Sequence, residues 1–404
     1  MKVDASVTQP FSQSVPPAAA EPAPSLGLMH AVFVLAGLGT LLLGPILPLL
    51  SRQWGLFDSQ AGQLLLAQFC GATLGGVTVS SRLARDLLIG LFAAAIGFAV
   101  FAAAVSIPTF AFAAGFYLSL PALVVGGFGV GRVIATVNII GGSRYAAHRG
   151  AALARLNFTW SVGALLSPLL AAWLAPRIAL QKLIGAYAAL FVLCVIVLIL
   201  QSMNSRGAES SMQSASAEHT LAPRFFLYFS ALLFIYGGLE TCLNGWLTTY
   251  ALRYGKTSLV LSEYTMVLLL SGLTAGRALA AWLLLKMRDV TLQRIALVLS
   301  AALAAALALN HRASLIAALA VLLGIALAPI FPATFALLMA HRPPARTAGL
   351  VLAASGLGAA ALPSLMGVVS TRAGSLEIAL AIPVAAAVTM LLLSAIPPTE
   401  KPAQ

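Results

Sequence analysis

A chain of 404 residues that is 60% hydrophobic and 8% charged is not expected to be soluble, because soluble domains carry roughly a quarter of their residues as charged side chains. The formal net charge is +12, but no soluble basic domain accompanies it, so a nucleic-acid partner is not expected. The composition predicts an integral membrane protein.

Twelve apolar stretches are each long enough to cross a bilayer as a helix, which takes about 20 residues. They cover residues 28–50, 60–80, 87–106, 111–140, 151–174, 183–203, 224–250, 261–284, 291–309, 314–339, 347–370 and 376–396. Their Ala, Leu and Gly content shows no alternating pattern, which favours helices over a β-barrel. We therefore predict an all-α membrane protein with twelve transmembrane helices. Pro45 and Pro48 are predicted to interrupt span 1, and Pro329 and Pro332 to interrupt span 10.

The basic residues predict the orientation of these spans. With the N-terminus inside, fourteen lie on the inner side: Lys2, Arg82, Arg85, Arg144, Arg149, Arg155, Arg206, Arg224, Lys286, Arg288, Arg294, Arg342, Arg346 and Lys401. Seven lie outside: Arg52, Arg177, Lys182, Arg253, Lys256, Arg312 and Arg372. This bias predicts two cytoplasmic termini, with the excess charge facing anionic lipid. The expected location is the bacterial inner (cytoplasmic) membrane.

A polar stretch at residues 204–223 divides the spans into two sets of six. The predicted organisation is a disordered cytoplasmic tail at 1–24, a six-helix bundle at 25–203, a cytoplasmic linker at 204–223, a second six-helix bundle at 224–397 and a short cytoplasmic tail at 398–404. No signal peptide is recognised at the N-terminus. Cys70, Cys194 and Cys242 all lie within spans and are expected to be packing residues.

The two halves repeat one another. Gly163 and Pro168 in span 5 correspond to Gly358 and Pro363 in span 11, at a shift of 195 residues. Similar shifts relate Gly71 and Gly75 to Gly272 and Gly276, and Gly127 to Gly324. Together with the central linker, these matches predict an internal duplication, and secondary transporters are commonly built from such repeats around a midplane site.

Three charged residues lie inside spans and away from the span ends: Glu240, Arg132 and Arg277. Such residues are costly in hydrocarbon and usually functional. Glu240 forms one polar stripe with Tyr236, Asn244 and Thr248. Tyr236 and Asn244 are predicted to contact the substrate. Glu240 is predicted to carry protons, the alternative being an interhelical hydrogen bond.

Arg132 is predicted either to contact an anionic substrate or to pair with Glu240 across the bundle. Arg277 is predicted to have a gating or structural role, with its stem directed toward the inner surface. Arg82 and Arg85 are further gating candidates.

Five other polar or aromatic residues are candidate substrate contacts: Gln68, Asn138, Asn157, Ser161 and Trp246. Interhelical hydrogen bonding is the competing interpretation for the first four, and packing for Trp246. Binding of ATP, a metal ion or a dinucleotide is not expected. The chain has no phosphate-binding loop for ATP, its five His are scattered, and Gly127, Gly129 and Gly131 lie in a span rather than after a strand. No metal or cofactor is predicted.

Several segments resemble the major facilitator superfamily, and within it the fucose-permease-like branch, over about residues 28–396. They are GGFGVGRVIATVN, RGAALARLNFTWSVGALLSP, YGGLETCLNGWLTTYAL, GLTAGRALA, GIALAPIFPATFALL and SGLGAAALPSLMG. The superfamily's inner loop motif, G-x-x-x-D-R-x-G-R-[RK], is partly present in VTVSSRLARD, where Arg82 and Arg85 match its arginines. Ser81 stands where the Asp is expected, Ala84 where the Gly is, and Asp86 where a base is.

The resemblance implies two pseudo-symmetric six-helix bundles that rock about a central cavity lined by spans 1, 4, 7 and 10. Members of the fucose-permease-like branch resemble one another in having an acidic residue in span 1 and another in span 4. This chain has no acid in span 1 and has Arg132 near the span 4 position, so the sugar–proton mechanism of the branch does not carry over residue by residue.

The predicted function is secondary active transport of a small polar solute, a sugar or organic anion, by proton-coupled uptake. The partners expected are a small-molecule substrate, protons and lipid, and the protein is expected to act as a monomer. Proton-driven efflux of drugs or metabolites is the first alternative. A polytopic membrane enzyme or receptor is the second, and the short loops argue against it.

Overall fold

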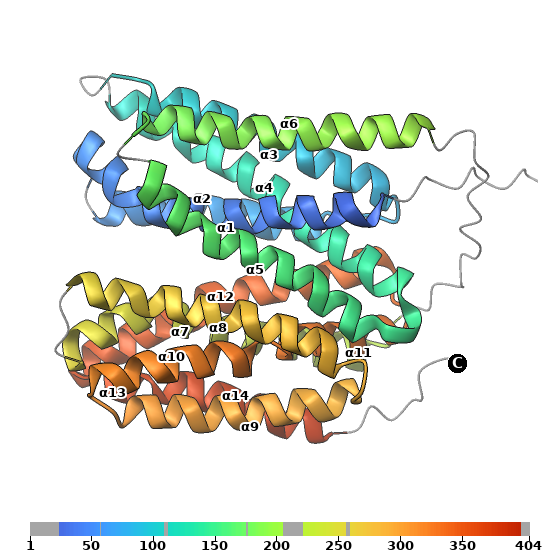
Figure 1. The fold of residues 1–404 in the computed structure, drawn as a ribbon, viewed down its shortest axis with the longest axis vertical. Helices are drawn as coiled ribbons and strands as arrows, with labels where there is room; N and C mark the ends of the chain where they lie inside the picture. Colours follow the sequence, from blue (N-terminus) through green and yellow to red (C-terminus); the bar gives the residue numbers. More distant parts are fainter. Residues whose placement is uncertain are drawn as a thin grey trace, which may run out of the picture.

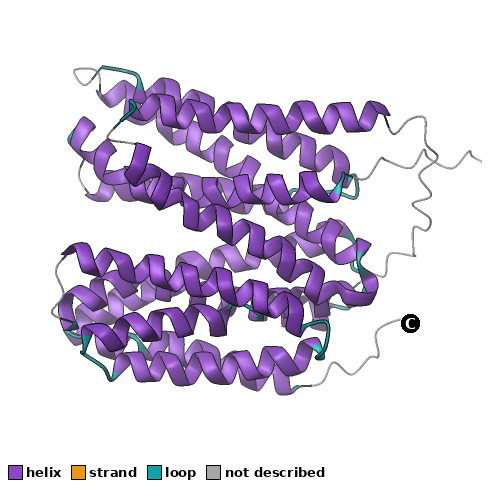
Figure 2. Ribbon diagram, in the orientation of Figure 1, coloured by secondary structure: helices purple, strands orange, loops and turns teal. Residues whose placement is uncertain are grey.

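The computed structural model describes residues 24–56, 58–108, 112–174, 177–204, 221–255 and 259–396. Over these residues the chain is helical and contains no strand (Figure 2). The helices are α1 (Leu26–Trp54), α2 (Asp58–Val77), α3 (Leu83–Val105), α4 (Phe112–Arg144), the 3-10 turn η2 (Ala146–His148), α5 (Arg149–Leu174), α6 (Leu180–Asn204), α7 (Pro223–Tyr254), α8 (Leu259–Leu283), α9 (Asp289–Ala308), α10 (Ala313–Leu327), α11 (Ile330–Ala340), α12 (Ala345–Ala373), α13 (Leu376–Ala379) and α14 (Ala381–Ala395). The predicted tails and most of the linker fall outside the described residues.

The twelve predicted spans are confirmed, and two of them consist of two helices each. Span 10 is α10 followed by α11, and span 12 is α13 followed by α14. Within the described residues, ten spans are long and apolar enough by themselves to cross a membrane. The other two are α2, whose described apolar stretch is the shorter Gln63–Val77, and α5, which carries more polar side chains than its neighbours.

Prolines act differently in the two spans where breaks were predicted. The break in span 10 is confirmed, because α10 ends at Leu327 and α11 begins at Ile330, just after Pro329. The predicted break in span 1 is wrong, since α1 continues through Pro45 and Pro48 to Trp54. A proline removes one backbone donor, but a membrane helix can continue past it when its other hydrogen bonds and its neighbours hold the backbone.

The helices pack as two bundles, one blue to green and the other yellow to red in Figure 1. Helix α5 packs on α1, α4 on α2 and α6 on α3 in the first bundle, and α12 on α7, α10 on α8 and α14 on α9 in the second. The order of packing is thus the same in both, and each bundle has its own apolar core. The fold is that of two pseudo-symmetric lobes.

Corresponding glycines make the same close approach in the two bundles. A Cβ on Gly163 would lie 1.9 Å from the carbonyl oxygen of Val34 in α1, and a Cβ on Gly358 would lie 1.7 Å from that of Phe234 in α7. Real side chains cannot occupy such positions, so both helix pairs meet backbone to backbone, as small residues permit in membranes. The repeat noted in the sequence therefore corresponds to a repeated contact.

We predict that Gly358→Val prevents correct assembly of the second bundle, because overpacking alone costs about 1–3 kcal/mol and here the obstacle is backbone. The measurement is the yield and thermal stability of monodisperse protein in detergent. Gly27→Ala is the matched control, since a Cβ there would have nothing within 4 Å. A Gly358→Val protein as stable as the control would contradict the close approach.

The two bundles meet at one end, here called the terminal end, where α1 and α7 begin and α6 and α14 end (right in Figure 1). Helix α5 packs against α8 and α11, and α2 packs against α12. Small side chains of α5, α8 and α11 form a shared apolar cluster there, including Ala151, Ala280 and Ala333. This closed end lies next to the polar contacts described below.

Candidate functional site

An arginine joins the two bundles near the middle of the membrane. Arg277 of α8 donates through Nη1 to the hydroxyl of Ser161 and to the carbonyl oxygen of Asn157 (3.4 Å), both in α5 of the other bundle. Its Nη2 lies 3.7 Å from Oε1 of Glu240 in α7. Ser161 is twelve residues into α5, or about 18 Å along a helix, roughly half the apolar thickness of a bilayer.

The direction of the Arg277 side chain differs from the sequence prediction. We expected the stem to extend toward the inner surface, but the side chain is 3% exposed and turns inward to Glu240 and Ser161. The Cα–Cβ bond of a helical residue points toward the helix N-terminus, which for α8 is the direction away from the terminal end. The predicted snorkelling is therefore wrong, and the guanidinium lies in the interface between the bundles.

Aromatic rings surround this arginine. The guanidinium carbon lies 5.2 Å from the ring centre of Trp160, a distance at which cation–π attraction is effective. Tyr236 is 2% exposed and interacts electrostatically with both Glu240 and Arg277. Its ring packs against Phe331 of α11, with 5.8 Å between the ring centres. Aromatic rings therefore pack against both Arg277 and Tyr236.

Two amides extend the polar contacts into the first bundle. Nδ2 of Asn157 donates to Oδ1 of Asn138 in α4 at 3.1 Å and to the carbonyl oxygen of Leu153. Asn138 in turn donates to the carbonyl oxygen of Ile134. Both amides are buried, so the pair holds α5 on α4. The backbone carbonyl of Asn157, on the same residue, is the one that Arg277 contacts.

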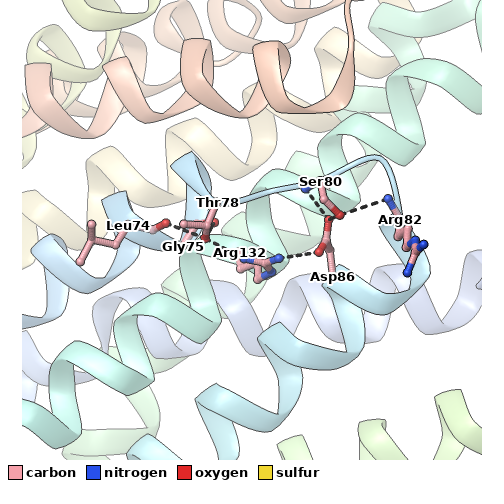
Figure 3. Close-up of polar contacts among 7 residues, drawn as sticks. All are labelled: Leu74, Gly75, Thr78, Ser80, Arg82, Asp86 and Arg132. Carbon is pink, nitrogen blue, oxygen red and sulfur yellow. Dashed lines mark hydrogen bonds and ion pairs between the residues drawn. The ribbon is translucent and has the colours of Figure 1, made fainter. Parts of the chain in front are cut away.

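The structure gives Arg132 a different partner from the one predicted. Its Nη2 lies 2.5 Å from Oδ1 of Asp86 and its Nη1 donates to Thr78 at 2.6 Å (Figure 3). Asp86 is 1% exposed and also accepts from the backbone N–H and the hydroxyl of Ser80. The predicted approach of Arg132 to Glu240 is therefore wrong, because a nearer carboxylate at the start of α3 pairs with the guanidinium within its own bundle.

The loop between α2 and α3 explains this pairing. The acid expected in the family motif is replaced by Ser81, and Asp86, which stands where a base is expected, supplies the carboxylate instead. The side chains of Arg82, at the end of that loop, and Arg85, in the first turn of α3, are exposed, and the backbone N–H of Arg82 donates to the Ser80 hydroxyl. A gating role for these two arginines stays a prediction.

Two other candidates make contacts typical of packing. Nε2 of Gln68 donates to the carbonyl oxygens of Gly39 (2.9 Å) and Thr40 (3.2 Å), which ties α2 to α1. Nε1 of Trp246 donates to the carbonyl oxygen of Pro363 at 3.1 Å, which ties α7 to α12. The structure brings neither of them into the contacts of Arg277, and their predicted role in substrate binding remains a prediction.

Several buried polar atoms near Arg277 have no hydrogen-bond partner among the described residues. They are Nε of Arg277 itself, Nε1 of Trp160, the hydroxyl oxygen of Tyr236 and Oδ1 of Asn244, which lies one turn beyond Glu240. Buried polar atoms are seldom left unsatisfied, so this group of donors and acceptors is suited to a polar ligand or to water. The side chain of Glu240 is 16% exposed, whereas that of Arg277 is 3% exposed.

Comparison with known proteins gives a consistent result for the fold. A family model described as Major Facilitator Superfamily matches residues 29–311. No curated protein sequence matches the chain.

Similar solved structures include FucP, the E. coli fucose:proton symporter, in an outward conformation (TM-score 0.71, 17% identity, covering 91% of this chain and 97% of that chain). The proton:xylose symporter XylE gives a TM-score of 0.72 at 15% identity, covering 90% and 93%. The human organic anion transporter MFSD10 gives 0.70 at 18% identity, covering 91% and 98%.

Proposed function

The chain belongs to the major facilitator superfamily, and from that premise we propose that it is a secondary active transporter that takes up a small polar solute together with protons. The observation that carries the proposal is the buried pair of Arg277 and Glu240 at the junction of the two bundles. Two of the similar structures are proton symporters of sugars and one transports organic anions, which supports a sugar or an organic anion as the solute.

Alternating access requires that the two bundles separate at one end while they close at the other. In this structure they touch at the terminal end, where Gly142 of α4 faces Met339 of α11 and Gly349 of α12 faces Gly76 of α2. With cytoplasmic termini, as the basic residues predict, this state is closed to the cytoplasm. We therefore assign it as the state that receives solute from outside, in a bacterial inner membrane.

Proton coupling is assigned to Glu240. When its carboxylate is ionised it attracts Arg277, and Arg277 in turn contacts Ser161 and Asn157 in the other bundle. Protonation removes that attraction and frees the guanidinium for the solute. A proton and a solute can therefore enter the same site together, and the bundle junction responds to both.

A cysteine pair tests the alternating access. A Cβ on Gly142 would lie 3.2 Å from Cβ of Met339, close to the separation in disulfides, which is about 3.5–4.5 Å. We expect Gly142→Cys with Met339→Cys to form a disulfide under oxidation and to stop uptake, with reduction restoring it. The measurement is pH-driven accumulation in proteoliposomes of a labelled panel of neutral sugars and carboxylates.

The background for this experiment is Cys70→Ser, since Cys70 is exposed. Each single cysteine variant serves as the matched control. Full uptake by the cross-linked protein would overturn the proposal that the terminal end must open. Failure of the wild-type protein to accumulate any member of the panel would argue against proton-coupled uptake.

A further inference from the structure

We infer that the solute is a hydroxylated monocarboxylate, such as a sugar acid, whose carboxylate binds Arg277 while Glu240 is protonated. This inference deepens the proposed function and depends on it for the transport step. The argument rests on the capacity of Arg277 to accept an anion, on the charge of the site and on the polar atoms around it.

The guanidinium of Arg277 is only partly used by the protein. It has five N–H donors, and those on Nη1 serve Ser161 and Asn157. Nη2 lies 3.7 Å from Glu240, longer than a hydrogen bond, and Nε has no partner among the described residues. The edge formed by Nε and Nη2 therefore makes no hydrogen bond to a described residue, and the hydroxyl of Tyr236, which also interacts with this guanidinium, makes none either. That fork matches a carboxylate with two parallel hydrogen bonds.

Arg132 makes a closer ion pair than Arg277 does, although its Nε also has no partner among the described residues. Its Nη2 is 2.5 Å from Asp86, and that carboxylate is 1% exposed and held by Ser80. Glu240 is 16% exposed and lies more than 1 Å farther from its arginine. The distances identify Arg277, rather than Arg132, as the cation that can exchange its carboxylate partner for one from solution.

The charge of the site selects a monoanion. Arg277 and ionised Glu240 together are neutral, so an added carboxylate would leave an uncompensated buried negative charge, which is costly. Protonation of Glu240 leaves one positive charge, which one carboxylate neutralises. A phosphate ester with two negative charges would again leave one uncompensated negative charge in the site. The carboxylate and the proton therefore bind together, and one of each per cycle makes transport electroneutral.

The neighbouring groups favour hydroxyls on the rest of the solute. Nε1 of Trp160 is an unpartnered donor and Oδ1 of Asn244 an unpartnered acceptor among the residues described. A hydroxyl group can both donate and accept, so it can satisfy either atom. The ring of Trp160, which is partly exposed, provides flat apolar surface for the carbon skeleton.

Binding to purified wild-type protein tests the inference, with gluconate, glucuronate and lactate compared with glucose and glucose 6-phosphate. Quenching of tryptophan fluorescence is a suitable signal, because Trp160 lies directly beside Arg277. We expect at least one hydroxylated monocarboxylate to bind at least about tenfold more tightly than glucose or the phosphate ester, and more tightly at low pH than at high pH. Glucose binding as tightly as the carboxylates, or no carboxylate binding, would overturn the inference.

Variants separate ligand contact from loss of structure. Arg277→Gln should weaken carboxylate binding at least about tenfold, and Arg277→Lys should restore part of it, because lysine keeps the charge but not the fork. Arg253→Gln, at an exposed position at the end of α7, is the matched control.

Glu240→Gln should bind the carboxylate at high pH as tightly as the wild type does at low pH, because its competitor for Arg277 is permanently neutral. This variant keeps the inference testable if Arg277→Gln fails to fold. A Glu240→Gln protein that binds carboxylate as weakly at high pH as the wild type would contradict the exchange of partners.

Transport distinguishes this inference from the proposed function. Proteoliposomes that accumulate a neutral sugar under a pH gradient would leave the proposed function standing and overturn the carboxylate class. A carboxylate that binds as expected but is not accumulated would support the site and contradict proton-coupled uptake. Uptake of a carboxylate that responds to the pH gradient and not to membrane potential would support both.

Discussion

Replacing Asp86 with alanine is expected to destabilise the protein by about 3–5 kcal/mol, because it would leave Arg132 buried and without its counter-charge. Arg132 is 7% exposed, and the 2.5 Å contact with Asp86 is its ion pair in the described part of the chain. The N–H and hydroxyl of Ser80 would lose their acceptor as well. The measurement is the apparent melting temperature and the yield of monodisperse protein.

A second variant tests the cause. Adding Arg132→Met to Asp86→Ala removes both charges, and a buried ion pair replaced by apolar side chains is often neutral for stability. We expect the double variant to recover most of the loss, whereas Arg82→Ala, at an exposed position on the same loop, should change little. If the double variant is as unstable as Asp86→Ala alone, an unpaired arginine is not the reason for the loss.

Glu240→Gln is expected to abolish pH-driven accumulation while leaving part of the exchange of solute across the membrane. A gradient of one pH unit corresponds to about 1.4 kcal/mol and supports about tenfold accumulation per proton. Without a titratable group at residue 240, uptake should stop at equal concentrations on both sides. Glutamine keeps the size and polarity of the side chain, so the bundle junction should still form.

The measurement is counterflow and pH-driven uptake of the same labelled solute in proteoliposomes. Glu377→Gln is the matched control, because that glutamate lies near the opposite end of the second bundle, where it contacts His311. Unchanged accumulation by Glu240→Gln would show that another group carries the proton. Loss of counterflow together with accumulation would indicate that Glu240 is needed for structure rather than for coupling.

The sequence was sufficient to predict the fold. Hydropathy identifies twelve spans because every backbone polar group in a bilayer must be satisfied inside a helix. The spacing of Gly163 and Gly358 identified the two halves, and the structure places both glycines against the backbone of a corresponding helix. Helix breaks were less predictable, since proline ends α10 but not α1.

The candidate site was only partly predictable. The spacing of Tyr236 and Glu240 predicted one polar face, and the structure brings both residues to Arg277. The partners of the two arginines could not be read from spacing, because they depend on which helices are adjacent and on which way each side chain turns. The importance of Asp86 was indicated by the altered loop motif, in which this acid stands where a base is expected. Trp160 lies within the segment RGAALARLNFTWSVGALLSP, but nothing in the sequence around it indicates a contact with Arg277.

The duplicated architecture is not symmetric at the residue that matters most. The shift of 201 that relates Gly75 to Gly276 also relates Gly76 to Arg277. Gly76 lies against Ala353 and Gly349 of α12, whereas its counterpart carries a guanidinium toward α5. The positive charge that Arg277 brings to this junction therefore comes from the second bundle, and the corresponding position of the first bundle supplies none.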